Sequence, residues 1–197
     1  MAHLTAVDPT LAAIIAANPP CAMQPDPDIF VGLVEAIVCQ QLSVKAAATI
    51  FGRFKALFND QVTPQSVVEA PLDAMRACGL SWGKAAYVHD LCAHILDGRL
   101  ELDRLDALSD EDIITELTAV KGIGRWTAEM ILMFHLNRPD VLPVADLGIR
   151  EGFKRAYGLE ERPGPETMAQ IAEPWRPWRT LGCWYLWRIL ENAPLSA

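Results

Sequence analysis

The chain has 197 residues and a formal net charge of −8, and hydrophobic residues make up 51% of it. This length allows one domain, or two small lobes that share a core. The acidic balance argues against a protein that binds nucleic acid through a uniformly basic surface, although a local basic face remains compatible with it. The five cysteines are scattered without Cys-x-x-Cys spacing, which excludes the common zinc and disulfide patterns and favours a reducing cytoplasm.

The apolar run near the N-terminus is short, since "LAAIIAA" has seven residues and no Lys or Arg precedes it. A signal peptide begins with basic residues, and a membrane-spanning helix needs about 20 apolar residues. We therefore expect a cytoplasmic protein without membrane association.

Helical periodicity dominates the chain, and alternating strand patterns are hard to find. Capping residues mark several helix starts, among them Asp28, Ser43 and Ser109. The predicted helices cover residues 8–17, 28–39, 43–58, 80–96, 109–120, 125–134, 146–157, 165–173 and 177–191, with two short helices opening at Pro64 and Pro71. Residues 137–146 form the clearest extended segment because their prolines disfavour helix. The pattern predicts an all-α protein.

A Gly-x-Gly turn separates two of these helices, with Gly122 and Gly124 directly before the predicted start at Arg125. The first N–H groups of a helix carry partial positive charge and suit a phosphate. Any tight turn between two helices also favours glycine, so the turn alone leaves both interpretations open. The patterns of a phosphate loop and of a dinucleotide-binding fingerprint are absent from the sequence.

The longer string "LTAVKGIGRWTAEMI" resembles the helix-hairpin-helix of the base-excision DNA glycosylases. The matching residues are Leu117, Gly122, Ile123, Gly124, Thr127 and Ala128, and Lys121 stands where proline is usual. The resemblance implies that DNA phosphates are bound by Lys121, Gly122, Gly124, Arg125 and Thr127. It also implies that the backbone carbonyls of Thr118, Val120 and Ile123 can hold a structural Na⁺ or K⁺.

Asp146 follows a proline-rich loop and lies twenty residues after Trp126. From this residue alone, a helix cap and a catalyst are equally good interpretations, and one side chain can serve both roles. The resemblance favours catalysis, because the superfamily places its aspartate after such a loop. A fixed carboxylate stabilises the positive charge that develops on deoxyribose when the glycosidic bond breaks, and it can activate water.

Trp126 occupies the position at which bifunctional members of the superfamily carry a nucleophilic lysine. The resemblance therefore implies a monofunctional enzyme that uses water. Iron–sulfur members have four closely spaced cysteines near the C-terminus, whereas this half of the sequence has only Cys183. We expect no iron–sulfur cluster and no required cofactor.

The strings "GIGRWTA", "PVADLGIR" and "PWRPWRTLGCWYLWRIL" resemble the alkylpurine branch, the 3-methyladenine DNA glycosylase II family, over roughly residues 28–190. Alkylated purines are cationic, and an indole face attracts a cation by about 0.5–2 kcal/mol. The resemblance implies a base pocket formed by Trp126 and Trp187, with Met130 where an aromatic residue is common. Core packing is the alternative for most of the C-terminal tryptophans.

The segment "VCQQLSVKAA" places a polar pair between two apolar helices. An ordinary solvated loop is one interpretation. The resemblance implies instead that Gln41, with Gln40 and Leu42 beside it, enters the minor groove as a wedge when the target base leaves the stack. Trp82 and Lys84 mark a second turn that the sequence predicts to be exposed. A contact between this turn and the DNA backbone is a weaker hypothesis.

The implied fold is an all-α, two-lobed helix-hairpin-helix glycosylase with an active-site cleft between the lobes. Residues 1–197 would form a single catalytic core without the β-rich N-terminal domain of larger family members. The middle lobe would cover about residues 40–135 and contain the hairpin at 117–128. The other lobe would combine residues of about 1–39 and 136–197.

The implied function is a monofunctional DNA glycosylase in base-excision repair, a hydrolase of N-glycosyl bonds of the DNA-3-methyladenine glycosylase II type. It would flip out 3-methyladenine and 7-methylguanine from double-stranded DNA and leave an abasic site. We expect a monomer that associates with the nucleoid when bound to DNA. The alternatives are a non-catalytic helix-hairpin-helix DNA-binding module and a glycosylase for uracil or an oxidised purine.

Overall fold

The computed structural model describes residues 1–191, and over this range the chain forms twelve α-helices, two 3-10 helices and no β-strand. The prediction of an all-α protein is confirmed. Contacts group the residues into two compact units. We call residues 1–25 together with those from Leu132 onward unit 1, and residues 26–131 unit 2. No helix within residues 1–191 is both long and apolar enough to cross a membrane.

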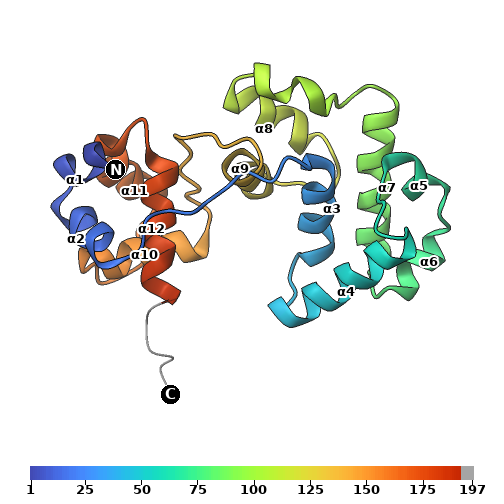
Figure 1. The fold of residues 1–197 in the computed structure, drawn as a ribbon, viewed down its shortest axis with the longest axis horizontal. Helices are drawn as coiled ribbons and strands as arrows, with labels where there is room; N and C mark the ends of the chain where they lie inside the picture. Colours follow the sequence, from blue (N-terminus) through green and yellow to red (C-terminus); the bar gives the residue numbers. More distant parts are fainter. Residues whose placement is uncertain (192–197) are drawn as a thin grey trace. The chain divides into compact units, whose positions relative to one another are not determined.

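Unit 1 joins the two ends of the described chain. Its helices are α1 (Ala2–Val7), α2 (Pro9–Ala17), α10 (Leu147–Tyr157), α11 (Pro165–Ala172), η2 (Glu173–Trp175) and α12 (Arg179–Glu191). In Figure 1 the blue N-terminal helices lie beside the orange and red C-terminal ones, and α2 packs against both α10 and α12. This arrangement brings residues more than a hundred positions apart into one core.

A buried carboxylate ties the core of unit 1 together. Asp8 caps α2, and its Oδ2 accepts hydrogen bonds from Trp175 Nε1 at 2.8 Å and from the Tyr157 hydroxyl at 2.6 Å. Phe153 stacks on Trp175 with the ring centroids 5.4 Å apart. Each polar atom of this aromatic cluster therefore has a partner, as burial requires.

Unit 2 is built around α7. Its helices are α3 (Ile29–Cys39), α4 (Val44–Leu57), α5 (Pro64–Glu69), α6 (Leu72–Ala77), α7 (Trp82–Leu96), η1 (Leu102–Ala107), α8 (Asp110–Thr118) and the first part of α9 (Arg125–Phe134). α7 packs against α3, α5 and α6, and α3 also packs against α4. The apolar faces of these helices supply the core, including Leu33, Ile37, Val88 and Leu91.

The contact-based grouping places α3 in unit 2, whereas the sequence prediction assigned residues 1–39 to the lobe with the chain ends. The reason is packing, since α3 buries its apolar side against α4 and α7. Three short elements were not predicted, α1, η1 and η2. Each has six residues or fewer and no side-chain hydrogen bond at the N-cap, so they carry no capping signal in the sequence.

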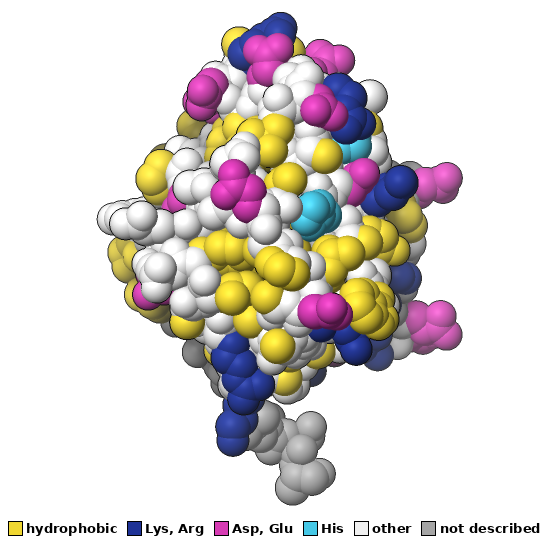
Figure 2. Space-filling view, turned by 90° about the vertical axis from the view of Figure 1, so that its right-hand side faces the viewer, with side chains coloured by type: hydrophobic (Ala, Val, Ile, Leu, Met, Phe, Trp, Pro, Cys, Tyr) yellow, Lys and Arg dark blue, Asp and Glu magenta, His cyan; other side chains and the backbone are white. Residues whose placement is uncertain are grey.

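Figure 2 shows the side of the molecule where α5, α6 and α7 lie in Figure 1. Acidic and basic side chains are intermixed on this face, with hydrophobic groups between them. Trp82, at the start of α7, is 56% exposed and has the Arg76 guanidinium 4.7 Å from its ring centroid. The charge of this face is therefore mixed, and any preference for an anionic partner has to come from local groups.

Candidate functional site

The two glycines of the hairpin turn face different surroundings. Gly122 has φ +87°, and a Cβ added there would lie 2.3 Å from Cδ2 of Tyr87 on α7. Only glycine fits this position without strain. A Cβ at Gly124 would meet no atom within 4 Å. Gly122 thus packs inward, while Gly124 leaves the start of α9 open, where the first N–H groups have no acceptor within the helix.

Arg125, which the sequence analysis assigned to a DNA phosphate, is held in an ion-pair network. Its guanidinium donates to Glu111 of α8, with Nη1 3.0 Å from Oε2, and its Nε lies 3.1 Å from Oε1 of Glu129. The hydrogen bond from Arg125 lowers the pKa of Glu111. The side chain therefore joins α8 to α9, and a phosphate would have to compete with two carboxylates for it.

The other predicted phosphate contacts differ in exposure. The Lys121 side chain is 77% exposed, with its Nζ 4.0 Å from Oδ1 of Asp90, and its backbone N–H donates to Oδ2 of Asp90 at 2.9 Å. Thr127 is only 4% exposed. A phosphate contact at Thr127 would consequently use the backbone N–H rather than the hydroxyl, whereas Lys121 can reach an anion with its side chain.

The predicted cation site consists of backbone carbonyls in the same turn. Thr118 is the last residue of α8, whereas Val120 and Ile123 lie in the segment that links α8 to α9. The Val120 oxygen accepts the Ile123 N–H at 3.2 Å. Carbonyl oxygens are a donor type that a hard monovalent cation accepts, so the donor set fits the expectation. Within the described residues, no cluster of three or more His, Cys, Asp or Glu side chains could hold a metal ion.

A cavity of about 540 Å³ lies within unit 2 beside the hairpin. Its lining combines Trp126, Thr127 and Met130 of α9 with Ala36 and Cys39 of α3 and with the turn Gln40, Gln41 and Leu42. Trp126 is 43% exposed, so its indole is open to solvent. The structure thus brings together all three predicted wedge residues and two of the three predicted base-pocket residues.

The glutamines of this turn point to different partners. Gln40 donates its Nε2 to the carbonyl oxygen of Gly122 at 2.8 Å, so its amide is engaged with the hairpin. Gln41 is exposed and has φ +56°, a left-handed conformation that a residue other than glycine rarely adopts. Of the three predicted wedge residues, Gln41 is therefore the one that forms the exposed tip of the turn.

In unit 1, Asp146 is the N-cap of α10, which confirms the capping role. Its Oδ1 accepts the Ile149 N–H at 2.7 Å and the Trp187 Nε1–H at 3.1 Å. A Cβ at Gly148 would lie 3.0 Å from the Trp187 nitrogen and 3.1 Å from that carboxylate oxygen. The absence of a side chain at Gly148 therefore makes room for the pair, and Asp146 itself is half-buried.

Trp187 is held from two sides. Its Nε1–H binds Asp146, and its ring stacks on Phe134 with centroids 5.8 Å apart and planes at 28°. It borders a cavity of about 370 Å³ with Phe134, Trp184, Arg188 and Leu190. Trp175 and Trp184 are buried, as the core-packing alternative expected, whereas Trp178 is 44% exposed. A rigid indole beside a carboxylate can both orient that carboxylate and offer its face to a ring.

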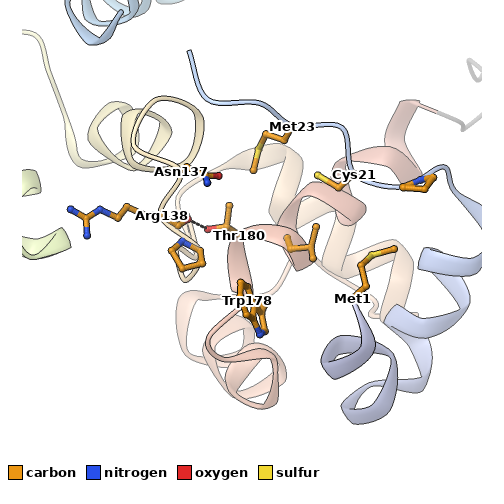
Figure 3. A pocket seen from close by; sticks show the side chains of 10 residues that line it. Met1, Cys21, Met23, Asn137, Arg138, Trp178 and Thr180 are labelled. Carbon is orange, nitrogen blue, oxygen red and sulfur yellow. Dashed lines mark hydrogen bonds between the residues drawn. The ribbon is translucent and has the colours of Figure 1, made fainter. Parts of the chain in front are cut away.

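A separate cavity of unit 1, about 340 Å³ in volume, is shown in Figure 3. Met1, Cys21, Met23 and Trp178 line it, and the Thr180 hydroxyl donates to the carbonyl oxygen of Arg138 at 2.6 Å. The Arg138 side chain extends away from these residues. This cavity shares no lining residue with the predicted site residues.

Four residues near the site were missed by the sequence analysis, namely Tyr87, Asp90, Glu111 and Phe134. Each contacts a site residue that lies at least fourteen positions away in sequence. Helical periodicity cannot predict contacts over such separations. A partial signal existed on α7, because Lys84, Tyr87 and Asp90 follow at intervals of three residues.

Comparison with known proteins decides the family. The model described as HhH-GPD superfamily base excision DNA repair protein matches residues 34–177, which include the hairpin and Asp146. The chain belongs to the HhH-GPD superfamily. Within it, DNA-3-methyladenine glycosylase 1 of Schizosaccharomyces pombe is 38% identical over 164 residues, covering 82% of this chain and 72% of that protein.

Two solved structures of the superfamily share the fold and a substantial part of the sequence. The S. pombe 3-methyladenine DNA glycosylase Mag1, in complex with abasic DNA, has a TM-score of 0.87 and 34% identity, covering 100% of this chain and 98% of that one. A DNA-3-methyladenine glycosidase from Bacillus halodurans has a TM-score of 0.88 and 37% identity, covering 96% and 88%. The expected helix-hairpin-helix glycosylase family is thereby confirmed.

Proposed function

We propose that this chain is a monofunctional DNA glycosylase that releases alkylated purines from double-stranded DNA in base-excision repair. The observation that carries the proposal is the Asp146 carboxylate, oriented by the Ile149 N–H and the Trp187 indole in a chain of the HhH-GPD superfamily. The names of the similar proteins, which are 3-methyladenine DNA glycosylases, support the same substrate class.

The chemistry of Asp146 follows from the substrate. When the glycosidic bond breaks, its electron pair moves to the alkylated base, which leaves as a neutral molecule, and positive charge develops on the deoxyribose. The carboxylate stabilises that charge and accepts the proton of the water that adds to the sugar. Two neutral donors hold Oδ1 and fix the orientation of the carboxylate.

The indole of Trp126 has two proposed consequences. It is exposed in the cavity of unit 2 and can stack on a cationic purine. It also has no amine with which to attack the sugar, so the enzyme would act as a glycosylase without lyase activity. Met130 leaves this cavity with a thioether where an aromatic ring is common.

DNA binding is proposed to rely on the open start of α9 and on Lys121, with Gln41 entering the duplex. The carbonyls of Thr118, Val120 and Ile123 would hold a monovalent cation that faces a phosphate. We propose a monomer that needs no further cofactor and that associates with the nucleoid when it is bound to DNA.

Base release from defined duplexes tests this function. The wild-type protein should release 7-methylguanine and 3-methyladenine from methylated DNA and should leave uracil and 8-oxoguanine in place. Reduction with borohydride during the reaction should trap no protein–DNA adduct. Release of uracil or 8-oxoguanine in preference to the alkylpurines would overturn the substrate class, and a trapped adduct would overturn the monofunctional mechanism.

A further inference from the structure

One side of α7 contacts both turns that are proposed to touch DNA. Lys84, Tyr87 and Asp90 follow one another at three-residue intervals, so they share this side. Lys84 binds the turn at residues 40–42, whereas Tyr87 and Asp90 contact the hairpin turn at Gly122 and Lys121. A single helix thus supports two segments that are about eighty residues apart in sequence.

Lys84 closes the C-terminal end of α3. Its Nζ donates to the carbonyl oxygens of Val38 at 2.9 Å and of Gln40 at 2.6 Å. The last carbonyl oxygens of a helix have no N–H donor within it and carry partial negative charge, so an ammonium group can both donate to them and offset that charge. Burial lowers the pKa of Lys84, in keeping with an ammonium that is partly withdrawn from water.

Gln40 completes the connection. Its backbone carbonyl accepts from Lys84, while its side-chain Nε2 donates to the carbonyl oxygen of Gly122 at 2.8 Å. Gly122 in turn lies against Tyr87, where no Cβ would fit. These contacts form a closed ring through α7, the 40–42 turn and the hairpin turn. Gln41 projects from the ring as its exposed residue, in a left-handed conformation.

We propose that Lys84 and Gln40 are positioning residues that join the turn bearing Gln41 to the hairpin turn, so that wedge insertion and phosphate binding occur at a fixed spacing. The inference rests on the proposed function, in which Gln41 enters the duplex and the start of α9 binds a phosphate. With the ring intact, a phosphate bound at α9 places Gln41 at the target base pair, and the interaction can drive base extrusion.

The ring of contacts predicts a specific kinetic effect. If the hydrogen bonds of Lys84 or Gln40 are removed, the hairpin can still bind a phosphate, but Gln41 is no longer held at a fixed distance from that phosphate. Affinity for undamaged duplex should then change little, while extrusion of a paired base becomes slow. A lesion that is already unpaired needs little extrusion and should be released at nearly the normal rate.

The variants Lys84→Met and Gln40→Met remove the two donors while keeping chain length and apolar contacts. Lys55→Met is the matched control, since Lys55 lies on α4 with its ammonium 5.3 Å from the Phe51 ring centroid. Each test variant should lower single-turnover release of a paired 7-methylguanine by about tenfold or more. Affinity for undamaged duplex should stay within about twofold, in line with an unchanged phosphate anchor.

Two further comparisons separate positioning from general stability. The same variants should release 7-methylguanine from an unpaired site at close to the wild-type rate, and the double variant should be no slower than the single ones. Equal losses on paired and unpaired targets would overturn the proposal, as would additive effects or a Lys55→Met variant that behaves like Lys84→Met.

Hydrogen exchange of the free protein tests the ring without DNA. Lys84→Met should speed amide exchange in residues 38–43 and, through Gln40, in residues 119–124, whereas Lys55→Met should change neither. Faster exchange confined to residues 38–43 would overturn the joining role even in an active enzyme. A wild-type protein that releases no base would instead overturn the proposed function, and the exchange result would still decide whether the two turns are joined.

Discussion

Two helix starts, one in each unit, use the same backbone property in opposite ways. The start of α9 follows Gly124, which has no side chain and faces open space. The start of α10 follows Asp146, whose carboxylate accepts a backbone N–H of its own helix. The first gives an external anion room to approach at Gly124, and the second uses one donor to hold a carboxylate in place. One helix start is therefore suited to binding and the other to chemistry.

The largest expected effect comes from Asp146→Asn. Asparagine caps a helix as well as aspartate does, so α10 should keep its start while the negative charge disappears. Single-turnover release of 7-methylguanine should fall by about 100-fold or more, because stabilisation of the developing cation is lost. Affinity for abasic duplex, measured by fluorescence anisotropy, should remain. Release within about threefold of the wild-type rate would contradict the assigned role, and Asp73→Asn on α6 is the control.

Gly122→Ala should damage the fold rather than the chemistry. Its Cβ would overlap the Tyr87 ring, and its backbone would be held at φ +87°. We expect a loss of about 2–4 kcal/mol in the free energy of unfolding, measured by urea denaturation. A change below about 1 kcal/mol would show that the hairpin turn can shift away from α7.

Trp187→Phe tests how the carboxylate is held. Phenylalanine can keep the ring stacked on Phe134, but it loses the N–H that donates to Asp146. A hydrogen bond to a charged group contributes about 1.5–3 kcal/mol, so we expect roughly tenfold slower base release with unchanged affinity for undamaged DNA. Trp178→Phe, at an exposed position of the same unit, is the control and should behave as wild type.

Gly124→Ala complements the change at Gly122. The new Cβ points into open space, so the free energy of unfolding should fall by no more than about 1 kcal/mol. The same methyl group would stand where a phosphate is proposed to approach, and affinity for undamaged duplex should drop several-fold. Unchanged affinity in an anisotropy titration would remove the start of α9 from the DNA interface.

The smallest effect is expected for Glu111→Gln, which frees Arg125 from one of its two carboxylates. The pair is largely exposed, so stability should change by less than about 0.5 kcal/mol. A released guanidinium should bind duplex slightly more tightly and with a steeper dependence on salt. Weaker binding would mean that Glu111 orients Arg125 toward a phosphate instead of competing with it.

Much of the local structure was predictable because it depends on neighbouring residues. The caps at Asp28, Ser43 and Ser109 form the expected hydrogen bonds to the backbone three positions later. The apolar periodicity that follows them produced the helices α3, α4 and α8. Arg125 shows the limit of this kind of inference. Its motif predicts a contact with a DNA phosphate, but the motif does not indicate that the carboxylate of Glu111, fourteen positions away, accepts hydrogen bonds from the same guanidinium.

The sequence by itself determined the helical content, the hairpin motif with its two glycines, and the spacing from Trp126 to Asp146. These properties rest on interactions within a few residues and on a motif that is typical of one protein family. Only the tertiary structure decided that Tyr87 makes Gly122 obligatory, that Trp187 holds Asp146, and that Lys84 supports the 40–42 turn. Each of these contacts joins segments that are at least 35 positions apart, where packing rather than local preference selects the partner.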